Sequence, residues 1–191
     1  QELGLFEMSG TGLAEVEEAT LAAESAPAAK GSPAARRAGT VFAPLQAGSR
    51  VLLAEIQALT ATGFLGAAKR RASGLDAARL AMLIAVLEKH GGLRLGDQDV
   101  YASALGGMRI TEPAADLATA LAIAGAFYER GAGPATVALG EIALSGDVRT
   151  VRQLDQRVQT AVRRGARLLL VPAAQASAAR AVAGGADVVP I

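Results

Sequence analysis

Apolar residues recur at helical spacing in two long stretches of the chain. Over 75–90 they form one face of a predicted helix, which ends where two glycines follow. A second helix is predicted from Pro113 to about Arg130, because proline is favoured in the first turn of a helix, where its missing N–H costs little. The apolar positions of the first helix are Leu75, Leu80, Leu83, Ile84 and Leu87. Shorter helices are predicted at 151–164 and 174–183.

Alternating apolar and polar residues predict strands before and between these helices. Within 51–61, the odd-numbered residues from Leu53 to Leu59 share one face of the predicted strand. The predicted strands lie at 3–8, 12–16, 40–45, 51–61, 98–105, 136–140 and 167–171, with a hairpin through Gly146. Strands and helices alternate in the second half without an internal repeat. The expected fold class is therefore α/β (or α+β), a mixed sheet with packed helices in one domain over 1–191.

Two segments are predicted to be loops. Residues 22–38 are a low-complexity stretch of Ala, Pro, Ser and Gly with few large apolar groups, so we expect a flexible surface loop there. The second segment, 62–73, reads TGFLGAAKRRAS and carries the adjacent cations Lys69, Arg70 and Arg71.

The composition narrows the chemistry that the chain can perform. Cysteine is absent, which excludes disulfides, thiol nucleophiles and cysteine-ligated zinc within the chain and fits a reducing compartment. The net charge of +1 gives no bulk electrostatic argument for nucleic-acid binding. No apolar run reaches the ~18–20 residues of a membrane span, so no membrane partner is expected.

Common catalytic and binding motifs are missing from the sequence. A metal site needs several clustered ligands, whereas His90 is the single histidine and is expected to serve a helix end. No GxxxxGK[ST] or strand-linked GxGxxG stretch is present, so the chain carries no phosphate loop. A Ser–His–Asp arrangement would need His90, and no nucleophile-elbow sequence accompanies it. Ser145 lies in the predicted hairpin without an evident partner.

Two blocks of the sequence resemble the proteolytic domain of Lon. Residues 111–124 read TEPAADLATALAIA, and residues 140–158 read GEIALSGDVRTVRQLDQRV. The corresponding Lon segments begin a helix with DGPSAG and later read GEITLxGxVLPIGGLKEK, at the same separation without a gap. The resemblance implies a Lon-protease-like fold, of the type that includes domain 2 of ribosomal protein S5.

The same resemblance implies that the Lon catalytic pair is lost. Pro113 matches the family's proline, but Ala114 stands at the serine nucleophile and Arg157 at the lysine base. Alanine offers no nucleophile, and arginine stays protonated, so it cannot accept the serine proton. Asp116 replaces a glycine of the Lon pattern and would place a carboxylate near the former active site. Proteolysis is therefore not expected.

Longer strings resemble one family in particular. The strings FEMSGTGLAEV, LEKHGGLRLGDQDVY and GGMRITEPAADLATALAIA are similar to the C-terminal domain of the RadA/Sms family of bacterial DNA repair proteins. That family carries EPAADLA where Lon has its serine motif. The resemblance spans nearly the whole chain and weakens only at 20–39 and after 172.

The resemblance implies that the chain is a fragment of a larger protein, with a four-cysteine zinc finger and a RecA-like ATPase outside it. The parent protein would be a DNA-dependent ATPase of homologous recombination that promotes branch migration as a hexameric ring. Single-stranded and branched DNA and the RecA recombinase are its implied partners. ATP, Mg and Zn are cofactors implied for the parent and none for the fragment. The implied location is the bacterial cytoplasm, in association with the nucleoid.

Three functions can be named for the fragment, of which the second fails on the residue chemistry of Ala114 and Arg157. The first is a non-enzymatic scaffold that supports the ring and contacts DNA, with Lys69, Arg70 and Arg71 as the main phosphate-contact candidates. An ordinary solvated charge run is the alternative for these three residues, and Arg79 and Arg94 are weaker candidates. The second function is a residual Lon-type serine peptidase. The third is a domain that only sets ring geometry without touching DNA, which the near-neutral charge favours.

Overall fold

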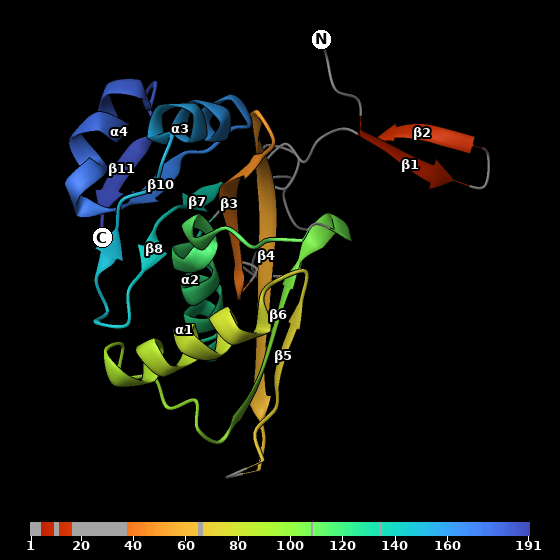
Figure 1. The fold of residues 1–191 in the computed structure, drawn as a ribbon, viewed down its shortest axis with the longest axis vertical. Helices are drawn as coiled ribbons and strands as arrows, with labels where there is room; N and C mark the ends of the chain where they lie inside the picture. Colours follow the sequence, from red (N-terminus) through yellow and green to blue (C-terminus); the bar gives the residue numbers. More distant parts are fainter. Residues whose placement is uncertain (1–4, 10–11, 17–37, 65–66, 108, 134) are drawn as a thin grey trace, which may run out of the picture.

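A seven-stranded sheet forms the centre of the protein (Figure 1). The computed structural model describes residues 5–9, 12–16, 38–64, 67–107, 109–133 and 135–191. The strand order of the sheet is β11-β10-β7-β3-β4-β6-β5. Its strands are β3 (Thr40–Ala47), β4 (Arg50–Thr62), β5 (Arg70–Ser73), β6 (Gln98–Ala104), β7 (Thr136–Ala138), β10 (Leu168–Val171) and β11 (Asp187–Pro190). Two antiparallel pairs stand outside it, β1 (Leu5–Ser9) with β2 (Gly12–Val16) and β8 (Glu141–Ile142) with β9 (Val148–Arg149).

The sheet is mixed, and helices connect its parallel strands. Four of the six strand pairings are parallel, and the two made by β4 are antiparallel. Parallel neighbours need a crossover connection, which is usually a helix. The helix α1 (Ala77–Lys89) joins β5 to β6, α3 (Leu154–Arg163) precedes β10, and α4 (Ala176–Val182) joins β10 to β11. The helix α2 (Asp116–Phe127) lies between β6 and β7 in the chain.

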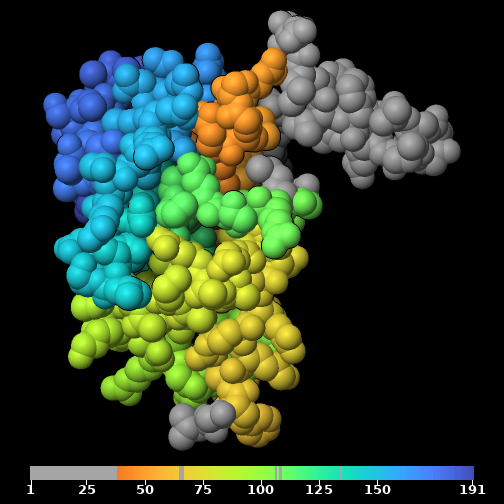
Figure 2. Space-filling view, viewed as in Figure 1, coloured from red at the N-terminus to blue at the C-terminus, as the bar shows by residue number. Residues whose placement is uncertain are grey.

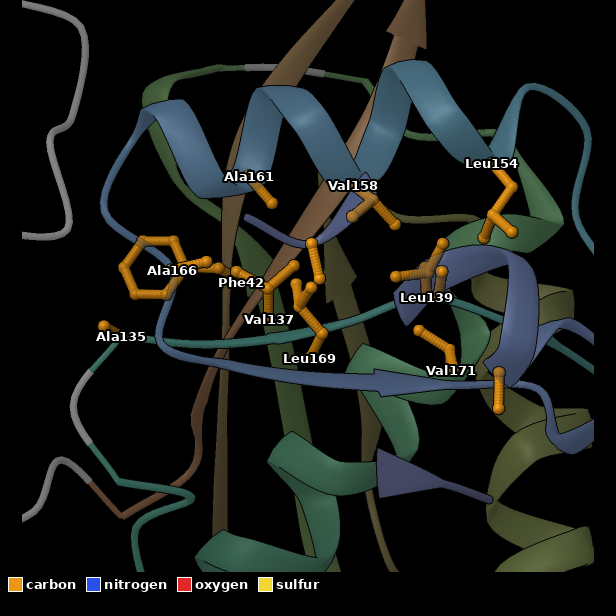
Figure 3. Close-up of a cluster of buried hydrophobic side chains, with 13 residues drawn as sticks. Phe42, Ala135, Val137, Leu139, Leu154, Val158, Ala161, Ala166, Leu169 and Val171 are labelled. Atoms are coloured by element: carbon orange, nitrogen blue, oxygen red, sulfur yellow. The ribbon is translucent and has the colours of Figure 1, made fainter. Parts of the chain in front are cut away.

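Alternation along β3 sends successive side chains to two different cores. Phe42 joins the cluster that α3 and α4 form over β7 and β10, where Val158 of α3 meets Leu169 (Figure 3). Its neighbour Val41 belongs to a second cluster with Leu117 of α2. The helices α3 and α4 therefore cover one face of the sheet, and α2 covers the other.

The helix α1 lies on the same face of the sheet as α2 and covers β6. Its buried residues Leu80 and Ile84 pack against Val100 and Ala102 of β6 and against Ile123 of α2. Asp76 is the N-cap residue of this helix, because its side chain accepts a hydrogen bond from the Arg79 N–H at 2.7 Å.

The expected α/β class, with a mixed sheet and packed helices, is confirmed. The predicted loop at 62–73 is wrong at its end, because Arg70–Ser73 form β5 and pair in parallel with β6. A four-residue edge strand is too short for alternation to be recognised, and two of its residues are arginines. The predicted flexible loop at 22–38 lies outside the described residues, apart from Ala38.

Candidate functional site

The two Lon-like blocks of the sequence meet in space through their backbones. The Gly140 N–H donates to the Ala114 carbonyl at 3.0 Å, and the Leu117 N–H donates to the Gly140 carbonyl at 3.1 Å. Asp116 adds a side-chain link, since its Oδ2 accepts from the Ile142 N–H at 2.9 Å. The 3-10 turn η3 (Pro113–Ala115) and the start of α2 are thereby held beside β8.

Arg157 is buried close to this junction. Arg157 is 1% exposed and lies on the apolar face of α3. Its Nε donates to the Arg152 carbonyl at 2.7 Å, and its Nη1 donates to the Pro44 carbonyl at 2.6 Å. Nη1 and Nη2 also pair with the two carboxylate oxygens of Glu112. The guanidinium therefore has four acceptor atoms around it, an arrangement unsuited to a general base, because it uses the side chain as a donor only.

Glu112 connects three elements through its carboxylate. Besides the pair with Arg157 of α3, its Oε2 accepts from the Gln46 N–H of β3 at 2.9 Å. Glu112 is the residue directly before η3, and its side chain does not cap that turn. One carboxylate thus joins β3, α3 and the segment that carries Ala114.

Asp116 anchors a second ion pair on the other side of η3. Its residue is 2% exposed, and Arg79 of α1 donates from Nε to Oδ1 at 2.9 Å and from Nη2 to Oδ2. Glu141 lies 3.6 Å from the same Nη2. The hydrogen bond with Asp116 is the main reason that the pKa of Arg79 is raised above its ordinary value, so the guanidinium stays charged at any accessible pH. Asp116 thus ties α1 and α2 to β8.

Two shallow hollows flank the Arg79–Asp116 pair along α1. One is lined by most of 110–116 and the other by 141–145, and both are lined by Arg79, Met82 and Leu83. In Figure 2 the hairpin around residue 145 (cyan) lies against α1 (yellow-green). Ala114 and Arg157, the positions of the Lon catalytic pair, line neither hollow.

The β8–β9 hairpin brings His90 and Ser145 close together without forming a hydrolase triad. His90 ends α1 as its C-cap, as expected, and its ring Nε2 lies 3.1 Å from the Leu144 carbonyl. Its ring packs on Gly146, at which a Cβ would come within 3.0 Å of the His90 Cγ. Ser145 has a partner, contrary to expectation, since its Oγ donates directly to Asp147 at 2.6 Å. Because no histidine stands between this serine and carboxylate, the three residues do not have the order of a Ser–His–Asp triad.

Two other kinds of feature are absent from the described part of the chain. No three His, Cys, Asp or Glu side chains gather there closely enough to hold a metal ion. None of the described helices combines the length and apolar character needed to cross a membrane.

Comparisons with known proteins give a consistent result. No protein-family model matches the chain. The chain is 40% identical over 176 residues to the DNA repair protein RadA of Bacillus subtilis, which covers 91% of this chain and 36% of that protein. RadA of Brucella abortus is 44% identical over 174 residues, with 90% and 35% covered, and RadA of Streptococcus pneumoniae is 38% identical over 173 residues, with 90% and 39% covered. The chain belongs to the RadA family. It spans roughly a third of the length of these relatives, 36% in the first case.

Because the chain belongs to the RadA family, the exposure of the five basic residues predicted to contact DNA phosphates is of interest. Lys69, with 62% of its side chain exposed, and Arg71 and Arg94 are open to solvent. Arg79 is engaged by Asp116, as described above. Among the five, Arg71 and Arg94 are exposed and have no printed ion pair with a described residue, whereas the exposed Lys69 has its Nζ 4.0 Å from the Asp99 carboxylate.

Arg70 differs from its two neighbours. Its Nη2 donates to the Leu95 carbonyl at 2.8 Å and its Nη1 to the Gln98 carbonyl, so the guanidinium fastens β5 to the turn before β6. The adjacent cations of this RadA-family chain therefore have separate roles, because strand alternation turns Arg70 and Arg71 to opposite faces.

Glu112 is the residue at this junction that the sequence pattern does not reveal. Arg157 follows Leu154 by three residues and precedes Ala161 by four, which places it in the apolar stripe of α3. A cation in a buried stripe requires a buried partner. The pattern indicates that requirement, but the partner lies 45 residues away in the sequence and only the fold identifies it.

Proposed function

We propose that the chain is a non-proteolytic, Lon-like scaffold domain of a RadA-type DNA repair protein. In this proposal it supports a hexameric ring and contacts DNA during branch migration of recombination intermediates. The carrying observation is the ion pair that buried Arg157, at the position of the Lon base, makes with the partly buried Glu112, in a chain whose relatives are named DNA repair proteins.

The absence of proteolysis in this proposal follows from residue chemistry. A Lon-type serine peptidase needs a hydroxyl nucleophile and a neutral amine beside it. Ala114 supplies only a methyl group and is 4% exposed. The Arg157 guanidinium donates to Glu112 and to two backbone carbonyls, and an arginine side chain offers no acceptor atom to take a proton.

The scaffold role is supported by the two ion pairs. Arg157–Glu112 joins α3 to η3, and Arg79–Asp116 joins α1 to α2, while their backbone partners extend to β3 and β8. A rigid domain of this kind can present one fixed surface to neighbouring copies. The proposed partners are other copies of the chain, single-stranded and branched DNA and a RecA recombinase. ATP, Mg²⁺ and Zn²⁺ would act in other parts of the parent protein, within the bacterial cytoplasm.

The proposed DNA contacts are electrostatic and come from the exposed cations. Lys69, Arg71 and Arg94 can neutralise phosphates without reading bases. Arg70 and Arg79 are already engaged by carbonyl and carboxylate partners, so the proposal does not assign phosphate contacts to them.

The proposal is tested by measuring the mass of the 191-residue chain by light scattering, alone and with a short duplex or single-stranded DNA, together with cleavage of an unfolded protein substrate. The proposal predicts that the chain forms assemblies larger than the 19.2 kDa monomer, that DNA promotes this assembly, and that the substrate is not cleaved. A chain that stays monomeric with DNA present, or that cleaves the substrate, would contradict it.

A further inference from the structure

Among the described residues, helices cover only one face of the half of the sheet that β4, β6 and β5 form. The α3–α4 core reaches β4 at Leu53. Further along β4 the residues of the same face are those at 55, 57, 59 and 61, and Leu59 is 61% exposed. The opposite face of this region is covered, since Ala58, Ala72 and Val100 pack under α1 and α2.

Strand register places an aromatic ring at the middle of this open face. Leu59 of β4 lies opposite Tyr101 of β6, and Tyr101 lies opposite Arg71 of β5. The three side chains thus form one row across three strands, with the ring between an aliphatic group and a guanidinium. The next row, from Gln57, Ser103 and Ser73, is polar and uncharged.

Of the charged residues around this row, Arg71 is free to bind an anion such as a phosphate. Asp99, which lies two residues before Tyr101, accepts from the Lys69 N–H at 2.7 Å and from the Tyr101 hydroxyl at 3.3 Å, and its Oδ2 lies 4.0 Å from the Lys69 Nζ. Its charge is therefore offset, and it holds the hydroxyl at the edge of the row. Arg71 is exposed and makes no ion pair with a described residue.

We propose that this open face, the row Leu59–Tyr101–Arg71, binds single-stranded nucleic acid by base stacking. A base lies on the Tyr101 ring, with Leu59 at one side of it, and Arg71 contacts the neighbouring phosphate. An aromatic ring on a strand face with a cation beside it is the arrangement by which sheets hold unpaired bases, whereas the faces of duplex bases are already stacked. The inference rests on the proposed DNA contact and specifies its chemical class.

The central test uses the fact that the chain contains two tyrosines and no tryptophan. In the variant Tyr128→Phe, Tyr101 is the only tyrosine and hence the source of tyrosine fluorescence. Tyr128 lies at the end of α2, so its replacement leaves the row intact. Titration with oligo-dT is expected to quench this emission along the binding curve. Oligo-dT that binds, by fluorescence anisotropy of a labelled strand, without quenching Tyr101 would overturn the proposal.

Substitutions separate stacking from general attraction. Tyr101→Ala is expected to weaken oligo-dT binding about 10-fold or more, with binding of a duplex unchanged and Tyr101→Phe close to the parent. Equal weakening for both DNA forms would overturn the stacking role while leaving the proposed DNA contact standing. If the parent chain bound no DNA at all, both the stacking role and the proposed DNA contact would be wrong. If Leu59→Ser or Tyr101→Ala lowered the oligomeric mass without affecting DNA binding, the face would be a contact between copies, and the proposal would be wrong.

Discussion

Arg157 and Glu112 lie 45 residues apart in the sequence and meet as a two-point ion pair inside the protein. The guanidinium also donates to the Pro44 carbonyl at 2.6 Å, so the pair joins α3 to β3 and to the residue before η3. In the Lon pattern this arginine position is occupied by the lysine base. Arg157 is thus a structural crosslink in this RadA-family chain.

Breaking the crosslink should destabilise the fold strongly. Glu112→Gln keeps the shape but leaves the guanidinium of Arg157, 1% exposed, without its counter-charge. Removing one member of a buried pair costs roughly 3–5 kcal/mol. Urea denaturation followed by far-UV circular dichroism should show a decrease of that order in the free energy of unfolding.

A double-mutant cycle provides the control for this prediction. If the two residues act as one unit, Arg157→Met combined with Glu112→Gln should cost clearly less than the sum of the two single changes, with a coupling of about 1 kcal/mol or more. Additive effects would contradict the crosslink.

Introducing the serine and lysine of the Lon pattern should not create proteolysis. In the double variant Ala114→Ser with Arg157→Lys, the new amine would lie beside the Glu112 carboxylate, which favours the charged form. A protonated amine cannot accept the serine proton. Incubation with an unfolded protein substrate should therefore give no more cleavage than the parent chain, and turnover by the double variant would refute this reasoning.

Asp116 should control the local stability of the β8–β9 hairpin. The Ile142 N–H has the Asp116 carboxylate as its acceptor, at 2.9 Å. Asp116→Ala removes that acceptor and the partner of Arg79, and loss of hydrogen bonds to a charged group costs about 1.5–3 kcal/mol. Hydrogen exchange at Ile142 should accelerate in this variant.

The neighbouring amide of Ala143 serves as an internal reference. It donates to the Asp147 carbonyl within the hairpin, so its exchange should change less than that of Ile142. Equal acceleration at both amides would indicate opening of the whole hairpin instead of the loss of one link.

The sequence predicts the elements of this fold better than the links between them. Periodicity locates α1 and the long strand β4 because each has enough residues to display its repeat. It misses β5, where four residues, two of them arginines, follow no clear alternation. Comparison with the Lon pattern identifies Ala114 and Arg157, yet Glu112 remains hidden because ion pairs between distant segments leave no local signature.

Arg70 and Arg71 should respond differently to the same substitution. Arg70→Ala removes hydrogen bonds to the Leu95 and Gln98 carbonyls and should lower the free energy of unfolding by about 1–3 kcal/mol. Arg71→Ala, at an exposed position, should stay within about 0.5 kcal/mol of the parent. Thermal unfolding of the two variants side by side measures the difference, and equal stabilities would contradict a structural role for Arg70.

DNA contact by exposed cations is tested most directly by a salt series of DNA binding. Labelled single-stranded and duplex DNA would be titrated with the parent chain and with the double variant Lys69→Ala/Arg71→Ala. We expect binding that falls steeply with salt and a logarithmic slope that decreases in the variant by about 1.8 for the duplex and about 1.4 for the single strand, since each phosphate that is no longer neutralised contributes about 0.9 or about 0.7. Absence of binding by the parent chain, or an unchanged slope in the variant, would contradict the account.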